Sequence, residues 1–149
     1  MDYTRRAEEL FMGGYNCCQA VFTAFAERYG LTQEEALRLS GAFGAGFGGA
    51  REVCGVVSAM TLVCGLECGA VTTDAKAKKA CYDKEQELLN AFKAKTGGKI
   101  ICRELLGIVA GETLPYASER SPEYYKTRPC IKLVTQAARI LEETFAEKA

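Results

Sequence analysis

All three prolines of this 149-residue chain lie near its C-terminal end, at Pro115, Pro122 and Pro129. Proline removes a backbone hydrogen-bond donor and clashes with the preceding turn, so it is the residue least compatible with a helix interior. The first 114 residues are therefore free of the strongest helix breaker. No segment is a convincing strand. We expect an all-α protein, a compact single-domain bundle of about six or seven helices over residues 1–149.

Local signals at helix ends place the first helices. Residues 2–12 form a short helix that a pair of glycines ends. An Asn or Thr followed three residues later by Gln or Glu matches the capping box, in which two side chains satisfy the first backbone N–H groups of a helix. The two matches are Asn16 with Gln19 and Thr32 with Glu35. The second and third helices are therefore predicted to begin at these positions.

Apolar spacing places the later helices. A glycine-rich crossing over residues 41–49 leads to a helix over residues 53–64 that is apolar almost all round and is therefore expected at the centre. A short helix over residues 102–106 and a proline-containing loop over residues 111–128 follow a long charged helix over residues 74–95. The last helix is predicted to begin at Pro129. Apolar residues at helical spacing predict the face of each helix that points into the core. In the long helix they are Ala77, Cys81, Leu88 and Phe92, and in the last helix they are Ile131, Val134, Ala138, Leu141 and Phe145.

Eight cysteines and no histidine restrict the chemistry of this chain. Without histidine, the chain cannot carry a Ser-His-Asp or Cys-His mechanism. Zinc, haem, Rieske and di-iron sites that need histidine ligands are excluded for the same reason. Cysteine is therefore the residue type most expected to carry out chemistry in this chain.

The net charge and the N-terminal sequence indicate which binding partners and which cellular location to expect. Nineteen basic and nineteen acidic residues give a net charge of zero, so we expect no nucleic-acid partner. The first ten residues lack the apolar run of a secretory signal, and no stretch is apolar enough to cross a membrane. We expect a cytoplasmic protein without a membrane partner, in which cysteines serve as metal ligands, redox thiols or buried apolar groups.

Four predicted helix starts carry sulfur: Cys17 and Cys18 follow the Asn16 cap, and the other three starts have Cys54, Cys102 and Cys130. The N-terminal end of a helix offers unpaired N–H groups and a positive dipole, which favour the thiolate that binds metal or attacks a disulfide. Basic neighbours add to this effect, with Arg51 near Cys54 and Arg103 beside Cys102. The alternative is that small residues are common near helix ends.

The other four cysteines, Cys18, Cys64, Cys68 and Cys81, are interpreted mainly as buried packing groups. Cys64 and Cys68 are four residues apart in one helix, where a disulfide is awkward although both could touch one ligand. No pair has the Cys-x-x-Cys spacing of thioredoxins or zinc ribbons.

The glycines at 44, 46 and 49 match the Gly-x-Gly-x-x-Gly pattern of dinucleotide-binding proteins. No strand precedes them, so we interpret this run as a close-packed crossing that lets Cys17 and Cys54 approach each other. Glu52 could relay protons to a sulfur site, but a charge that compensates a helix dipole is the more common role of such a residue.

Several segments together resemble the C_GCAxxG_C_C family of putative redox-active proteins, which are small bacterial and archaeal proteins with four signature cysteines. The segments are NCCQAV at 16–21, the glycine run, EVCGVVSA at 52–59, CRELLG at 102–107 and Cys130. The resemblance covers nearly the whole chain and places the signature sulfurs at Cys17, Cys54, Cys102 and Cys130. Val56 and Ala59 replace the alanine and the final glycine of the family's central motif.

The favoured function is a redox or electron-transfer protein in which these four cysteines converge as catalytic and cofactor-binding residues. They would hold an iron–sulfur cluster or other thiolate-bound metal, or work as thiol/disulfide pairs. Some family members have been suspected of holding an iron–sulfur centre. A redox partner protein is implied, and a homodimer is a further expectation.

Two alternatives remain open at this stage. One is a helical adaptor without redox activity, stabilised by Cys-ligated zinc or by disulfides. The other is a thiol enzyme with Cys54 as nucleophile, in which Glu52, a lysine or the helix dipole would activate the thiol.

Overall fold

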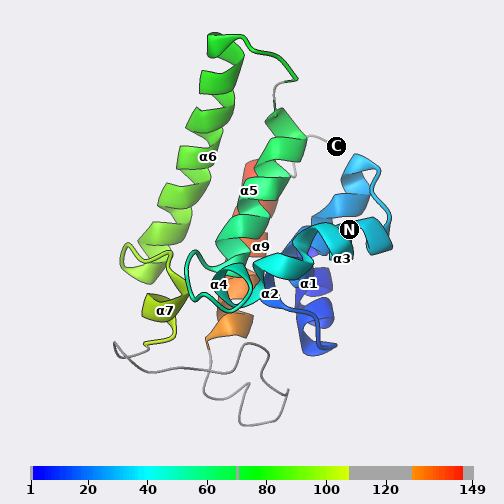
Figure 1. Cartoon of the computed structure of the whole chain (residues 1–149), viewed down its shortest axis with the longest axis vertical. Helices are drawn as coiled ribbons and strands as arrows, with labels where there is room; N and C mark the ends of the chain where they lie inside the picture. The colour runs from blue at the N-terminus through cyan, green and yellow to red at the C-terminus, as the bar shows by residue number, and fades with distance from the viewer. Residues whose placement is uncertain (1, 70, 108–128, 146–149) are drawn as a thin grey trace.

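The computed structural model is a bundle of helices (Figure 1) and describes residues 2–69, 71–107 and 129–145. In chain order the elements are α1 (Tyr3–Met12), α2 (Cys17–Ala26), η1 (Glu27–Tyr29), α3 (Gln33–Ser40), η2 (Gly41–Phe43), α4 (Gly44–Phe47), α5 (Gly55–Cys68), α6 (Ala75–Thr96), α7 (Cys102–Leu105) and α9 (Cys130–Phe145). The described residues contain no strand, only one isolated antiparallel bridge between Val53 and Ile101. The all-α prediction is confirmed. The loop expected over residues 111–128 lies outside the described residues.

The predicted helix starts are confirmed in atomic detail. Asn16 accepts a hydrogen bond from the Gln19 N–H at 2.8 Å, and the Gln19 side chain accepts one from the Asn16 N–H at 3.1 Å. The same reciprocal pair joins Thr32 and Glu35 before α3. These bonds satisfy N–H groups that have no partner within the helix. The position of Cys17 as the first residue of α2 is therefore set by its own sequence neighbourhood.

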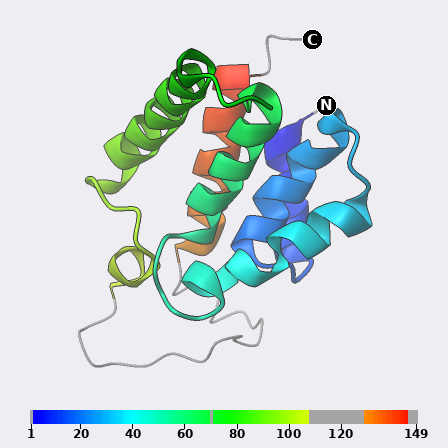
Figure 2. The ribbon, with the colours of Figure 1, turned by 45° about the horizontal axis from the view of Figure 1, so that its top comes forward.

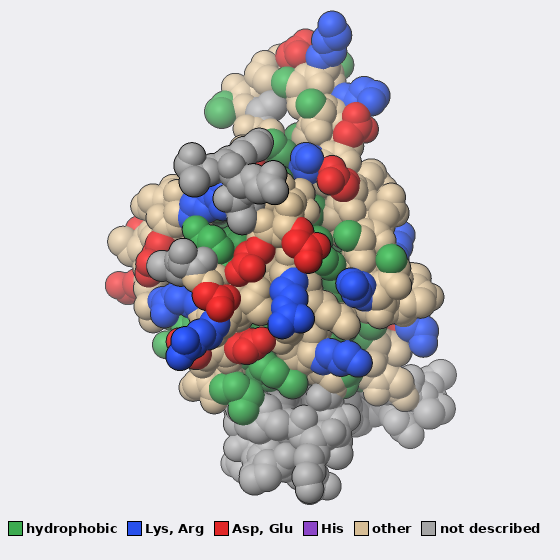
Figure 3. Space-filling model, turned by 180° about the vertical axis from the view of Figure 1, so that it is seen from behind, with side chains coloured by type: hydrophobic (Ala, Val, Ile, Leu, Met, Phe, Trp, Pro, Cys, Tyr) green, Lys and Arg blue, Asp and Glu red, His purple; other side chains and the backbone are tan. Residues whose placement is uncertain are grey.

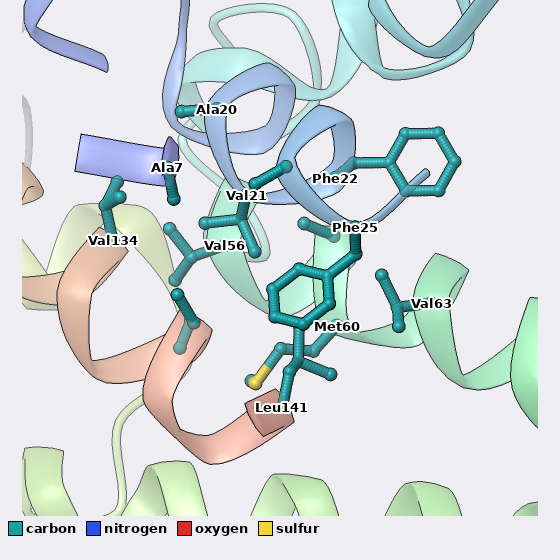
Figure 4. Packing of buried hydrophobic residues seen from close by; sticks show 14 of the residues in the cluster. Ala7, Ala20, Val21, Phe22, Phe25, Val56, Met60, Val63, Val134 and Leu141 are labelled. Carbon is teal, nitrogen blue, oxygen red and sulfur yellow. The ribbon is translucent and has the colours of Figure 1, made fainter. Parts of the chain in front are cut away.

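The core forms where α1, α2, α5 and α9 meet (Figure 2). Figure 4 shows side chains from α2, α5 and α9 converging, among them Phe25, Met60 and Leu141, each at most 1% exposed. In the first half of α5 every residue from Gly55 to Met60 is buried, as its nearly continuous apolar sequence predicts, whereas Thr61, Gly65 and Leu66 in the second half are exposed. The inner stripe of α9 is confirmed for Val134, Ala138, Leu141 and Phe145, whereas Ile131 is half-buried.

The stripe predicted for α6 is right only in the second half of that helix. Leu88 and Phe92 are buried, but Ala77 and Cys81 are half-buried. In Figure 1 the start of α6 extends beyond the end of α5, and the Cys81 sulfur lies beside the last turn of α5, 3.6 Å from the Cys68 sulfur. A periodic apolar stripe indicates which face points inward, but it does not show how far the neighbouring helix reaches.

The surface carries charges of both signs. Figure 3 shows acidic and basic side chains interspersed over the visible face, without an area of one sign. In the described ranges, no helix combines the length and the apolar character that crossing a bilayer requires.

Asn16→Ala should lower the free energy of unfolding by about 1–2 kcal/mol, because it removes the cap of α2. It also removes the hydrogen bond that the Asn16 side chain donates to the Gly41 carbonyl at 3.0 Å. Urea unfolding followed by circular dichroism measures the change. Asn16→Asp keeps the acceptor for the Gln19 N–H and should lose less, so equal losses in the two variants would contradict this role of the cap.

Candidate redox site

The backbone around residues 44–51 is bent into left-handed conformations. Three non-glycine residues here have positive φ: Ala45 at 55°, Phe47 at 65° and Arg51 at 60°. Each such residue costs about 1 kcal/mol or more, so the surrounding structure must hold this segment in place. The Arg51 N–H donates to the Ala45 carbonyl at 3.1 Å, and the Glu52 N–H donates to the Gly46 carbonyl at 3.0 Å. The crossing is thus a fixed turn that leads into α5.

Three glycines, two in this turn and one at the start of α5, permit close contacts. A Cβ atom on Gly55 would lie 2.5 Å from the Cys17 sulfur, and one on Gly46 would lie 2.8 Å from the Cβ of Cys102. A Cβ on Gly44 would lie 2.6 Å from the Asn16 side chain. These distances confirm the interpretation of the glycine run as a close-packed crossing. No strand precedes this run in the described part of the chain, as the sequence predicted.

Cys17 and Cys54 form a hydrogen-bonded sulfur pair at the starts of α2 and α5. The pKa of Cys17 is lowered to about 7, chiefly by a hydrogen bond with the Cys54 thiol and further by backbone hydrogen bonds at Ala45 and Cys18. The pKa of Cys54 is raised by the same hydrogen bond and by burial. Cys54 is buried, at 5% exposure, whereas Cys17 is half-buried. Near neutral pH Cys17 is therefore present as both thiol and thiolate, and the Cys54 thiol stabilises the thiolate form.

Cys102 lies beside this pair. The bridge between Val53 and Ile101 is flanked by two hydrogen bonds, from the Cys54 N–H to the Ile100 carbonyl at 2.8 Å and from the Cys102 N–H to the Glu52 carbonyl at 2.6 Å. These bonds fix the start of α7 against the start of α5. Cys102 is close enough that its charge would act on Cys54.

A buried arginine completes the site. Arg51 is only 6% exposed, and its guanidinium donates a hydrogen bond to the Cys102 sulfur at 3.7 Å. A buried cation is costly unless an anion or an acceptor faces it, so this contact favours negative charge on the sulfur atoms. From the sequence, Arg51 was expected to act on Cys54, but the structure places it against Cys102.

Cys130 occupies the first turn of α9 and is half-buried. Figures 1 and 2 both place the start of α9 at the same end of the bundle as α4 and α7. A depression lined by Glu104, Leu105, Pro129 and Leu133 also shows that α7 and the start of α9 are neighbours. The structure thus brings Cys17, Cys54 and Cys102 together and places Cys130 at the same end of the fold.

The other residues near the site have simpler environments. Cys18 is fully buried, and burial is the main cause of its raised pKa. This confirms that Cys18 is a packing group and identifies Cys17 as the sulfur that faces the site. The Glu52 side chain is exposed, and its backbone is what supports Cys102.

The sequence interpretation missed a second sulfur cluster at the other end of α5. The sulfur atoms of Cys64, Cys68 and Cys81 lie within 4.8 Å of one another, so this cluster could hold a metal ion. Cys64 is buried, as expected for a packing group, but Cys68 and Cys81 are only half-buried. The spacing of Cys64 and Cys68 indicated that both could touch one ligand, whereas nothing in the sequence placed Cys81 opposite them.

Alkylation of Cys17 should show a pH midpoint near 7, because only the thiolate reacts. Below this pH the sulfur is protonated and the reaction slows. Cys18 should stay unmodified while the protein is folded, since burial hinders both ionisation and access. Pulsed iodoacetamide labelling between pH 5.5 and 9, with peptide mass spectrometry, measures both sites. A Cys17 midpoint above about 8.5, the value of a free thiol, would contradict the structure.

One of three comparisons with known proteins found a match. A family model described as "Putative redox-active protein (C_GCAxxG_C_C)" matches residues 15–144. Neither the curated proteins nor the solved structures that were searched contain a match to the chain. The matched range includes Cys17, Cys54, Cys102 and Cys130. Because this match covers most of its length, the chain belongs to the C_GCAxxG_C_C family of putative redox-active proteins.

Proposed function

We propose that the protein carries out thiol–disulfide exchange, with Cys17 and Cys54 as the reactive pair. The proposal is carried by the close approach of α2 and α5, where a Cβ on Gly55 would lie 2.5 Å from the Cys17 sulfur, and by the neighbouring Cys54 thiol, which lowers the pKa of Cys17 to about 7. A half-buried thiolate can attack a disulfide, and a buried thiol within hydrogen-bonding reach can then displace the product. The absence of histidine is no obstacle, because the Cys54 thiol and backbone N–H groups stabilise the thiolate.

The reaction transfers two electrons from the dithiol to a disulfide on a redox partner protein. The Cys17 thiolate attacks one sulfur of the partner's disulfide, forms a mixed disulfide and releases the other sulfur as a thiolate. Cys54 gives its proton to that thiolate, and its sulfur then attacks Cys17. A Cys17–Cys54 disulfide forms, and the partner leaves as one thiol and one thiolate. The reverse sequence would oxidise a partner dithiol.

Controlled oxidation tests this proposal. Reduced protein is treated with oxidised glutathione under argon, remaining thiols are counted, and cross-linked peptides are mapped by mass spectrometry. We expect the loss of two thiols per chain, a Cys17–Cys54 link and full recovery with dithiothreitol. If Cys17 and Cys54 both stay open to alkylation after other cysteines have been oxidised, the proposal is wrong.

A second candidate function is a metal or iron–sulfur centre at the same end of the fold. It is favoured by the third sulfur, Cys102, and by the buried Arg51 guanidinium against it. Thiolates from Cys17, Cys54, Cys102 and Cys130 would make a ligand set suited to iron or zinc, and nearby cationic groups tune such centres. In this case the protein would carry electrons one at a time or, with zinc alone, act as a structural adaptor.

Metal and acid-labile sulfide analysis separates the two candidates. Protein purified without oxygen should contain no iron and no sulfide if thiol–disulfide exchange is its function. Iron with sulfide, accompanied by a visible spectrum that disappears in Cys102→Ser, would establish the cluster instead. Zinc that is lost in Cys17→Ser and Cys102→Ser would point to the adaptor.

A further inference from the structure

The three-cysteine cluster lies at the junction of α5 and α6. Cys64 and Cys68 occupy successive turns at the end of α5, and Cys81 faces them from the second turn of α6. The sulfur of Cys68 is 3.6 Å from that of Cys64 and 3.6 Å from that of Cys81. The cluster belongs to a different part of the fold from the Cys17–Cys54 pair, because the length of α5 separates the two sites by roughly 20 Å.

These separations match those of sulfur atoms around one metal ion. With a zinc–sulfur distance of about 2.3 Å and tetrahedral geometry, two thiolate ligands of the same ion lie about 3.8 Å apart. Two pairs in the cluster are already within a few tenths of an ångström of that value. All three sulfur atoms could therefore meet one ion with little movement of either helix.

A carboxylate stands next to the cluster. Glu85 follows Cys81 by one turn of α6, and one of its oxygen atoms accepts a hydrogen bond from the Thr61 hydroxyl on α5. The other, Oε1, is buried and has no hydrogen-bond partner among the described residues. Burial raises the pKa of Glu85, and the charge of Glu85 also acts on Cys64. A buried carboxylate oxygen without a hydrogen-bond partner is available to bind a cation.

We propose that Cys64, Cys68 and Cys81 bind a zinc ion, with Glu85 supplying the fourth ligand. Three thiolates and one carboxylate form a tetrahedral ligand set of the kind zinc accepts. The oxygen ligand favours zinc over monovalent copper, which prefers sulfur alone. The ion would hold the second turn of α6 against the end of α5, where Cys68 and Cys81 are only half-buried.

Zinc binding at this site should release protons. The pKa of an ordinary cysteine thiol is about 8.5, so thiol ligands are largely protonated at neutral pH when no ion is bound. The cation must displace those protons, and its affinity should therefore rise with pH between 6 and 8. The charged groups that act on the cluster are Glu67, Glu85 and Lys84.

Competition for zinc against a chromophoric chelator tests the proposal, with cobalt as a spectroscopic probe of thiolate ligands. Reduced full-length protein should bind one zinc ion per chain with strong sulfur-to-cobalt absorption. Cys81→Ser removes a thiolate ligand and should weaken zinc binding at least about 100-fold. Glu85→Gln removes the weaker carboxylate ligand and should weaken zinc binding about tenfold. The Cys17→Ser/Cys54→Ser double variant serves as the control and should bind as the parent protein does.

Two results would overturn the proposal. One is reduced protein that binds no zinc while its circular dichroism is native. The other is zinc binding that survives Cys81→Ser but disappears in the Cys17→Ser/Cys54→Ser variant, which would place the ion at the redox site. Cys81 is half-buried and lies outside the main core, so Cys81→Ser is expected to fold.

Discussion

Replacing Cys54 with alanine should raise the pH midpoint of Cys17 alkylation from about 7 towards about 8.5 and abolish the reversible disulfide. The hydrogen bond with Cys54 is the largest cause of the lowered pKa of Cys17, and alanine has no donor to replace it. The pKa of Cys17 rises in this variant because the hydrogen bond stabilises the thiolate form. Without it, more of Cys17 is protonated at neutral pH.

Cys54→Ser separates the two roles of this side chain. A hydroxyl can still donate a hydrogen bond to the Cys17 thiolate, so the midpoint should stay closer to 7 although no disulfide can form. Cys81→Ser is the matched control at the other end of α5 and should change neither property. The pulsed alkylation profile and the thiol count after oxidation measure both effects. An unchanged midpoint in Cys54→Ala would show that Cys54 does not stabilise the thiolate.

Gly55→Ala should destabilise the fold by about 1–3 kcal/mol and disrupt the Cys17–Cys54 pair. The added Cβ would lie 2.5 Å from the Cys17 sulfur and 3.2 Å from the Cys18 backbone nitrogen, so α2 and α5 must separate at this point. The expected result is a lower urea midpoint together with slower alkylation of Cys17 at pH 7.

Gly65→Ala provides a close comparison in the same helix. A Cβ there meets nothing within 4 Å, and the residue is exposed. Alanine stabilises a helix interior by up to about 1 kcal/mol relative to glycine, so this variant should be neutral or more stable. If both variants lose stability to the same extent, the close approach of Gly55 to Cys17 is not the cause.

The features that the sequence predicted well depend on neighbouring residues. The capping boxes at Asn16 and Thr32 act within four residues, so their geometry could be read directly. The central position of α5 followed from its continuous apolar character. The helix-start positions of the signature cysteines were likewise local, but the lowered pKa that they predicted is found at Cys17, chiefly through its neighbour Cys54, whereas the pKa of Cys54 itself is raised.

The features that could not be predicted depend on how distant segments meet. Helix α2 is apolar on nearly all sides, so its periodicity could not tell which of Cys17 and Cys18 would face the core. The contact of Arg51 with Cys102 requires the bridge between residues 53 and 101. The meeting of Cys81 with Cys64 and Cys68 depends on the register of α6 against α5, which a solvated helix leaves unspecified in its sequence.

The position of α9 has a consequence for biosynthesis. This helix packs against α1, α2, α5 and α6, so a growing chain cannot complete its core until α9 has left the ribosome. Seven of the eight cysteines are translated before that helix. During this interval their thiols are exposed to oxidants and can pair wrongly, since no native packing restricts them. The yield of correctly folded protein should therefore depend on reducing conditions during translation, even though four of the eight cysteines are buried in the finished fold.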